Sequence, residues 1–338
     1  MVELLNDILV FSFEELHECA LLHVSFHRTL RIPDDDRSYP LPPGLGHFPL
    51  RHVDDFGERS PQQWNRRGGI VLPMYQSEAL WLKFWSPFDY PFAVKVATGK
   101  INALTGESWN EGLVRDPQDY MQIPVQPWLD GYYVRTGVIR QFVAMPLGSG
   151  YSVEEQITGA AEHGGIQLLV HPLKASAYRP QPKWVYGPLE EPPAASDHFV
   201  GGSSAEGLEL GLAAGGYMAQ EVYHDTQEFN DWDLEHRGRC FVHLANSLTW
   251  RAITGEDPPT VPFTSAEYAN TGLPWFEYYA DGEEALPGGH LLNTIRSVTQ
   301  IGQQKGDVPL PENQSVAPEP VVKLRAGVQQ NEVREGAL

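Results

Sequence analysis

The chain has 338 residues, of which 24 are Lys or Arg and 44 are Asp or Glu, so its formal net charge is −20. That charge argues against nucleic-acid binding, which needs clustered basic side chains, and against docking on anionic membranes. The 32 glycines and 28 prolines argue against a helical bundle, while 41% hydrophobic residues suffice for a packed core and exclude a wholly disordered chain.

The amino-terminal residues and the cysteines favour a cytoplasmic location. Residues 1–22 are acidic and lack the basic segment and small-residue cleavage site of a signal peptide. No stretch approaches the ~18 consecutive apolar residues of a membrane span, so we expect no membrane insertion. Cys19 and Cys240 do not make a disulfide framework, and we expect two free thiols, as in a reducing compartment.

Segment 21–32 fits two secondary structures. A helix would place four residues on one face at intervals of four, as a possible metal-binding stripe: Glu15, Cys19, His23 and His27. A strand accounts better for the segment, because apolar and polar residues alternate and β-branched and aromatic side chains recur at period two. The strand places His23 and His27 on the solvent side, and only Arg28 breaks the alternation.

Further apolar runs bounded by Gly and Pro predict a mostly β fold with a few short helices. Two helix starts carry capping boxes, in which the N-caps Ser152 and Thr264 are followed three residues later by Glu155 and Glu267. After a loop-like segment, ordered structure is predicted to begin again at residues 208–219. The other predicted strands are 69–73, 79–84, 92–96, 101–107, 122–125, 138–145, 165–172 and 240–244.

Composition indicates one internal boundary. Residues 175–207 are rich in Pro, Gly, Ser and acidic residues, which predicts a linker or long loop. We therefore expect a β-rich unit over residues 1–174 and a second β-rich unit over residues 208–303, packed on the first. Residues 304–338 are polar, contain prolines and lack periodicity, which predicts a disordered tail.

Two segments of the chain resemble each other. Residues 92–107 and 240–256 each read as an apolar strand, a turn and a second strand, followed by Thr-Gly-Glu. A repeat of this kind predicts a duplicated β unit, with equivalent hairpins in equivalent sheets that pack as one or two β-sandwiches. Chance similarity between two hairpins is the alternative.

The densest polar cluster lies at residues 223–236. It includes Asp225, Asp231, Asp233 and His236, and carboxylates with imidazoles are suitable ligands for a divalent metal. The spacing matches no defined metal site, so the pattern favours a charge-rich surface loop, and the metal site is the alternative interpretation.

Motifs with a defined catalytic spacing do not appear. The sequence has no G-x-S-x-G nucleophile elbow and no phosphate-binding loop, so we expect no cofactor. His163 stands beside a Gly-Gly turn and is a second candidate for an active-site residue. Several tryptophans are candidates for sugar-stacking platforms or for core residues; they are Trp64, Trp81, Trp85, Trp128, Trp184, Trp232, Trp250 and Trp275.

A set of longer motifs resembles an uncharacterised family found in bacteria and in fungi, where some members carry ubiquitin-like domains. The motifs span about residues 45–300, and the resemblance implies no known activity, cofactor or catalytic residue. They lie at 74–81 (MYQSEALW), 126–131 (QPWLDG), 140–151 (RQFVAMPLGSGY), 156–167 (QITGAAEHGGIQ), 254–259 (TGEDPP) and 272–276 (GLPWF).

These observations lead to one functional hypothesis and two alternatives. We expect a non-catalytic binding or self-assembling protein whose partners are other copies or another protein. Strands such as 138–145 and 166–171 would serve assembly if they lie at a sheet margin. The alternatives are a hydrolase, with metal in the 223–236 cluster or with His163, and a carbohydrate-binding protein that uses the tryptophans.

Overall fold

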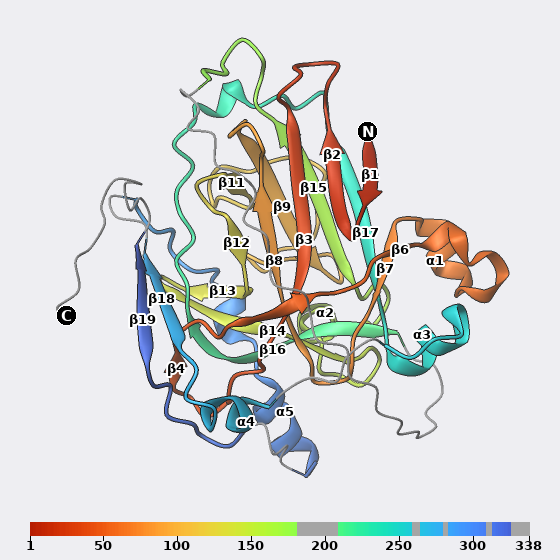
Figure 1. Cartoon of the computed structure of the whole chain (residues 1–338), viewed down its shortest axis with the longest axis vertical. Coiled ribbons are helices and arrows are strands. Elements are labelled where there is room, and N and C mark those ends of the chain that lie inside the picture. The colour runs from red at the N-terminus through yellow and green to blue at the C-terminus, as the bar shows by residue number, and fades with distance from the viewer. Residues whose placement is uncertain (181–208, 259–263, 280–282, 309–312, 326–338) are drawn as a thin grey trace, which may run out of the picture.

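The computed structural model describes residues 1–180, 209–258, 264–279, 283–308 and 313–325. It contains 39% strand against 16% helix, which confirms the predicted mostly β fold. Two large sheets share one hydrophobic core, and a small two-stranded sheet lies beside them (Figure 1).

The larger sheet has ten strands among the described residues, in the order β1-β2-β3-β8-β14-β16-β4, while β5, β12 and β13 pair with β3, β8 and β14. Most neighbours are antiparallel, but β16 and β4 are parallel. The strands are β1 (Val2–Leu5), β2 (Ile8–Ser12), β3 (Leu21–Thr29), β4 (Ser38–Tyr39), β5 (Gly44–His47), β8 (Ala79–Trp85), β12 (Trp128–Leu129), β13 (Gly131–Arg135), β14 (Val138–Pro146) and β16 (Leu210–Ala219).

The second large sheet runs in the order β10-β9-β15-β17-β7-β6, with β11 paired to β9. Its strands are β6 (Arg51–His52), β7 (Ile70–Pro73), β9 (Phe92–Thr98), β10 (Ile101–Asn102), β11 (Met121–Ile123), β15 (Ile166–Pro172) and β17 (Gly238–Ala245). The small sheet pairs β18 (Trp275–Tyr279) with β19 (Val321–Arg325) in parallel.

Short helices connect the strands. The α-helices are α1 (Gln62–Arg67), α2 (Val153–Thr158), α3 (Ser247–Thr254), α4 (Ser265–Ala269) and α5 (Val298–Lys305), and the 3₁₀ turns are Val53–Asp55, Gly57–Arg59, Phe229–Asp231 and Leu292–Thr294. The two predicted capping boxes are confirmed, because Ser152 and Thr264 each accept a hydrogen bond from the third helical amide at 3.2 Å.

The core lies between the two large sheets. Phe13 and Phe92 meet across it with ring centroids 6.1 Å apart, and the hydroxyls of Tyr132 and Thr98 hydrogen-bond at 2.6 Å. Gly238 comes so close to the core that an added Cβ would lie 2.4 Å from the Phe11 ring. Burial of each large apolar side chain contributes about 1.5–3 kcal/mol, so this shared core is the main source of stability.

The strand predicted over residues 21–32 is confirmed for residues 21–29, which form β3, and the helical metal stripe is not formed. The placement of its histidines at the solvent is wrong for His27, which is only 5% exposed. Its ring stacks on Trp81 of β8 with centroids 4.1 Å apart, and the His47 ring closes the other side at 4.2 Å. Neighbouring aromatic side chains, rather than the sheet interior, bury this residue.

The two similar segments do not form equivalent hairpins. Residues 92–107 contain β9 and its antiparallel partner β10, whereas residues 240–256 contain β17 followed by helix α3. Both strands also lie in one sheet, on either side of β15. Asn246 caps the helix by accepting from the Thr249 amide at 2.8 Å, so a local capping signal directs the second segment away from a hairpin.

The predicted division into two β-rich units does not match the sheets. Strand β16 pairs with β14 of the larger sheet, while β17 pairs with β15 and β7 of the second sheet. The predicted assembly strands, 138–145 and 166–171, are therefore interior strands with partners on both sides. Main-chain hydrogen bonds across the proposed boundary join the two halves into shared sheets.

Two further expectations concern the late segments. Residues 181–207 of the predicted linker, with residues 309–312 and 326–338 of the predicted tail, lie outside the described residues. The tail prediction is wrong for residues 321–325, which form β19 against β18.

Cys19 and Cys240 are both free thiols, as expected. Across the described ranges, no helix has the length and apolar character needed to cross a membrane.

Candidate functional site

Asp225, the first candidate metal ligand from the sequence, has a structural role. Its buried carboxylate accepts hydrogen bonds from the Tyr120 hydroxyl at 2.5 Å and from Nε1 of Trp232 at 2.8 Å. Burial raises the pKa of Tyr120, and the adjacent carboxylate raises it further, so the phenol remains a proton donor. Both donors are buried, and Asp225 stabilises the fold by pairing with them.

Asp233 and His236 form a local pair. The Asp233 carboxylate accepts from the His236 ring at 3.0 Å and from the backbone amides of Glu235 and His236. Burial alone would raise the pKa of Asp233, but these hydrogen bonds hold it below its usual value. Asp231 sits in a 3₁₀ turn nearby. Within the described residues, no group of three or more His, Cys, Asp or Glu side chains is placed to hold a metal.

The second candidate, His163, belongs to a loop organised by a buried carboxylate. Glu154 of α2 accepts from the amides of Glu162, His163 and Gly164 at 3.0, 2.8 and 2.8 Å, and lies 3.1 Å from Nδ1 of His163. The carboxylate thus fixes residues 162–164 against the helix. This contact gives His163 a structural role in the loop.

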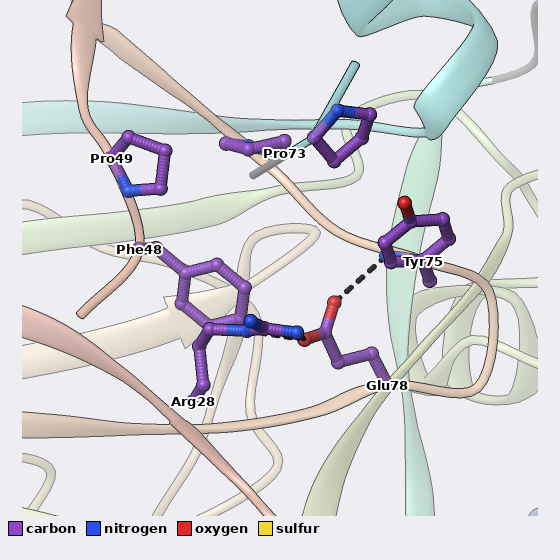
Figure 2. A pocket seen from close by; sticks show the side chains of 7 residues that line it. Arg28, Phe48, Pro49, Pro73, Tyr75 and Glu78 are labelled. Carbon is purple, nitrogen blue, oxygen red and sulfur yellow. Dashed lines mark hydrogen bonds and ion pairs between the residues drawn. The ribbon is translucent and has the colours of Figure 1, made fainter. Parts of the chain in front are cut away.

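An ion pair that the sequence analysis did not identify lies on the core side of β3. Arg28 donates through Nε and Nη2 to Oε1 of Glu78 at 2.7 and 2.6 Å, and the Tyr75 amide donates to Oε2 at 2.9 Å. Figure 2 shows the guanidinium beside the Phe48 ring, whose centroid is 5.7 Å from Cζ. The two charged side chains are 7% and 2% exposed.

This pair lies below a very small pocket. Three prolines and Tyr75 line it, and the Tyr75 hydroxyl points away from Glu78 (Figure 2). The cavity volume is about 10 Å³, which is about the space one water molecule needs. Burial raises the pKa of Glu78 although the Arg28 guanidinium opposes it. The site has charge but no room for a ligand.

A much larger cavity opens where three loops meet. Residues 104–107, residues 115–118 and residues 286–291 line a groove of about 460 Å³, together with Tyr133 of β13 and His224. This volume lies within the range of about 300–1,000 Å³ that is usual for small-molecule sites. We call this cavity the loop groove.

Hydrogen bonds within the protein fix the floor of the loop groove. The Tyr133 hydroxyl donates to the Leu286 carbonyl at 2.7 Å, and the Gly289 amide donates to the Tyr133 carbonyl at 3.0 Å. Gln118 donates to the Tyr120 and Tyr223 carbonyls at 2.8 and 3.2 Å. Burial raises the pKa of Tyr133, so its hydroxyl keeps the proton that it donates.

Two glycines allow the third loop to approach the sheet. A Cβ on Gly288 would lie 2.1 Å from Cα of Arg135, and one on Gly289 would lie 2.5 Å from the Leu104 carbonyl oxygen. Any side chain at either position would push the loop away from these backbone atoms. The shape of the loop groove therefore depends on this Gly-Gly pair.

Ionisable side chains stand at the rim of the loop groove. Glu107, Asp116, His224 and His290 are exposed there. Arg115 is held in place, since it donates to the Gln227 carbonyl at 2.8 Å. No hydrogen bond or ion pair joins these five side chains to one another in the described structure. They offer both signs of charge to a polar ligand.

Comparison with protein-family models, with curated proteins and with solved structures gave no match. The sequence carried one signal for the buried ion pair, which is the position of Arg28 as the single break in the alternation of β3. The loop groove carried none, because its three loops are far apart in the chain and contain no motif of defined spacing.

Proposed function

We propose that the protein is a non-catalytic binding protein that takes a small polar molecule into the loop groove. The observation that carries this proposal is the preformed floor, whose polar side chains already have their hydrogen bonds within the protein. A floor of this kind needs no rearrangement when a ligand enters, which reduces the entropy cost of binding.

The rim supports the choice of a polar ligand. Glu107 and Asp116 suit an amine, while Arg115 suits a carboxylate or phosphate, and the two histidines serve as donors or acceptors. No hydrogen bond or ion pair joins these groups within the described residues, and apart from the neighbours Arg115 and Asp116 they come from different segments of the chain. The arrangement therefore favours orientation of a bound molecule over proton transfer through a linked pair.

A thermal-shift screen of polar metabolites, followed by NMR of the histidine rings, tests this function. A true ligand should raise the melting temperature and shift the His224 and His290 signals. Leu291→Trp should fill the rim and abolish the effect, because Leu291 is 41% exposed and lines the groove. Leu273→Trp is the matched control, at a leucine that is 51% exposed and does not line the groove.

Two outcomes would overturn the proposal. The first is a ligand that binds equally well to the Leu291→Trp protein. The second is turnover of a bound compound that Glu107→Gln abolishes, which would establish a hydrolase instead.

Free thiols at Cys19 and Cys240 support the accompanying proposal of a reducing, cytoplasmic location.

A second candidate, self-association, is favoured by strand β1. Among the described residues this strand pairs only with β2, at the margin of the larger sheet, and Leu5 is 54% exposed. An unpaired apolar edge is a template for another strand. Light scattering should show larger particles as salt screens the charge of −20, and Leu5→Lys should prevent this. A monomer at every salt concentration would exclude it.

A further inference from the structure

The outer face of β3, β8 and β12 carries an array of aromatic side chains. On β8, Trp81, Lys83 and Trp85 alternate with the core residues and are half-buried. Trp128 of β12 stands opposite Lys83 in the strand register, so it points to the same face. We call the surface around these three tryptophans the aromatic face. Strands β3 and β8 lie side by side in Figure 1.

Neighbouring rings hold each indole in position. His23 meets Trp85 edge-on with centroids 5.0 Å apart, and Tyr278 of β18 meets Trp128 edge-on at 4.6 Å. The Lys83 ammonium lies 5.6 Å from the Trp85 ring centroid. The rings are therefore preorganised on a rigid sheet, which limits the side-chain entropy lost on binding.

The charge of this surface differs from that of the whole chain. The outward positions of β3 and β8 hold no carboxylate, although the protein carries a formal charge of −20. Lys83 is their only Lys or Arg. Burial lowers the pKa of His23, and burial with the nearby His47 and Lys83 lowers that of His27 to about 3, so both rings are neutral. The surface is polar and nearly uncharged.

We infer that the aromatic face binds a neutral oligosaccharide. The C–H bonds on one side of a pyranose ring form an apolar surface with a slight positive charge, which packs on the negative face of an indole. Sugar hydroxyls then find polar partners in Lys83 and His23. Trp81 and Trp85 are four residues apart on one strand, about 13 Å, which exceeds the length of a single pyranose ring.

Binding of cellohexaose, laminarihexaose and maltohexaose to the full chain tests the inference, by calorimetry and by tryptophan fluorescence. At least one should bind, and Trp85→Ala should weaken its affinity roughly tenfold, as expected for loss of one stacking contact. Trp85→Tyr keeps a ring and should restore most of the affinity. Circular dichroism checks that each variant is folded.

Trp109→Ala is the matched control. Trp109 is also half-buried and also has a lysine near its ring, with the Lys95 ammonium 5.9 Å from the centroid, but it lies outside the aromatic face. This variant should bind as the wild type does. Leu291→Trp in the loop groove should also leave sugar binding unchanged, so this site and the proposed function can fail separately.

Several results would overturn the inference. One is the absence of binding by all three oligosaccharides at millimolar concentration, and another is equal weakening by Trp85→Ala and Trp109→Ala. Binding of polygalacturonate alone would indicate an anionic partner. Loss of a dimer in Trp85→Ala, seen by light scattering without sugar, would show that a second copy covers this face.

Discussion

The Arg28–Glu78 pocket and the loop groove differ in what each provides. The pocket contains a buried ion pair, but its volume of about 10 Å³ excludes any ligand beyond about one water molecule. The loop groove has about 460 Å³, and its floor uses its hydrogen bonds to hold its own shape. The buried Arg28–Glu78 pair therefore leaves no space for a ligand, while binding space forms where loops meet.

The largest expected effect tests the structural role of the buried pair. Glu78→Ala should lower the free energy of unfolding by about 3–5 kcal/mol, because it leaves the Arg28 guanidinium buried without its carboxylate. Urea denaturation followed by circular dichroism measures this loss. The double variant Arg28→Met with Glu78→Leu should recover most of it, since an apolar pair needs no charge compensation. A loss below about 1 kcal/mol in Glu78→Ala would contradict the interpretation.

Asp130 is a second buried carboxylate, and unlike Glu78 it forms no ion pair with any residue that the structure describes. Burial raises the pKa of Asp130 to about 7, against the opposing effect of hydrogen bonds with Trp128 and Gln220. The folded state therefore keeps this proton to a higher pH than the unfolded state, where the pKa is about 3.9. The contribution of Asp130 to the free energy of unfolding should therefore fall as pH rises between about 4 and 7, by roughly 1 kcal/mol per pH unit. Above about pH 7 this contribution should change no further.

Asp130→Asn removes this titration and supplies the measurement. The difference in unfolding free energy between Asp130→Asn and the wild type, followed by urea denaturation at each pH, should grow across that range. The exposed Asp89→Asn serves as the control and should follow the wild-type curve. A wild-type protein that gains stability relative to Asp130→Asn as pH rises would show that the carboxylate is ionised in the folded state.

An intermediate effect separates two of the aspartates predicted as metal ligands. Asp225→Ala should destabilise the protein by about 2 kcal/mol, because it removes the acceptor of the buried Tyr120 and Trp232 donors. Asp231→Ala should change stability by less than about 0.5 kcal/mol. Thermal unfolding with and without a chelator checks both. Equal losses in the two variants, together with destabilisation by the chelator, would revive the metal site.

The smallest effect on stability is expected at the rim of the loop groove. Glu107→Ala should alter the unfolding free energy by less than about 0.5 kcal/mol while weakening a ligand found in the screen. Glu256→Ala is the matched control, because it also follows Thr-Gly and is exposed, but lies outside the groove. A Glu107→Ala protein with unchanged ligand affinity would remove this carboxylate from the binding site.

Local sequence patterns predicted many elements of the fold. Alternation identified β3, an apolar run identified β8, and the cap residues Ser152 and Thr264 identified the starts of α2 and α4, because these signals act over a few neighbouring residues. The same reasoning failed at residues 246–256, where a helix replaces the expected second strand. Asn246 is a helix-capping residue, but the similarity to residues 92–107 outweighed that signal.

The candidate sites were much less accessible to sequence reasoning. Asp225, Asp231, Asp233 and His236 are close in the chain, yet the structure gives them separate roles. Sequence proximity brings ligand types together but does not aim their side chains at one point. The aromatic face was visible only as an unordered set of tryptophans until the register of β8 and β12 placed three of them on one surface.

The sequence alone determined the β-rich class, the acidic surface, the free thiols and the faces of individual strands, because composition and period-two alternation are local properties. The tertiary structure decided which strands pair, why Arg28 points into the core and where the loop groove opens. These features join residues tens or hundreds of positions apart. Their free energy comes from contacts across the two sheets, which no window of neighbouring residues contains.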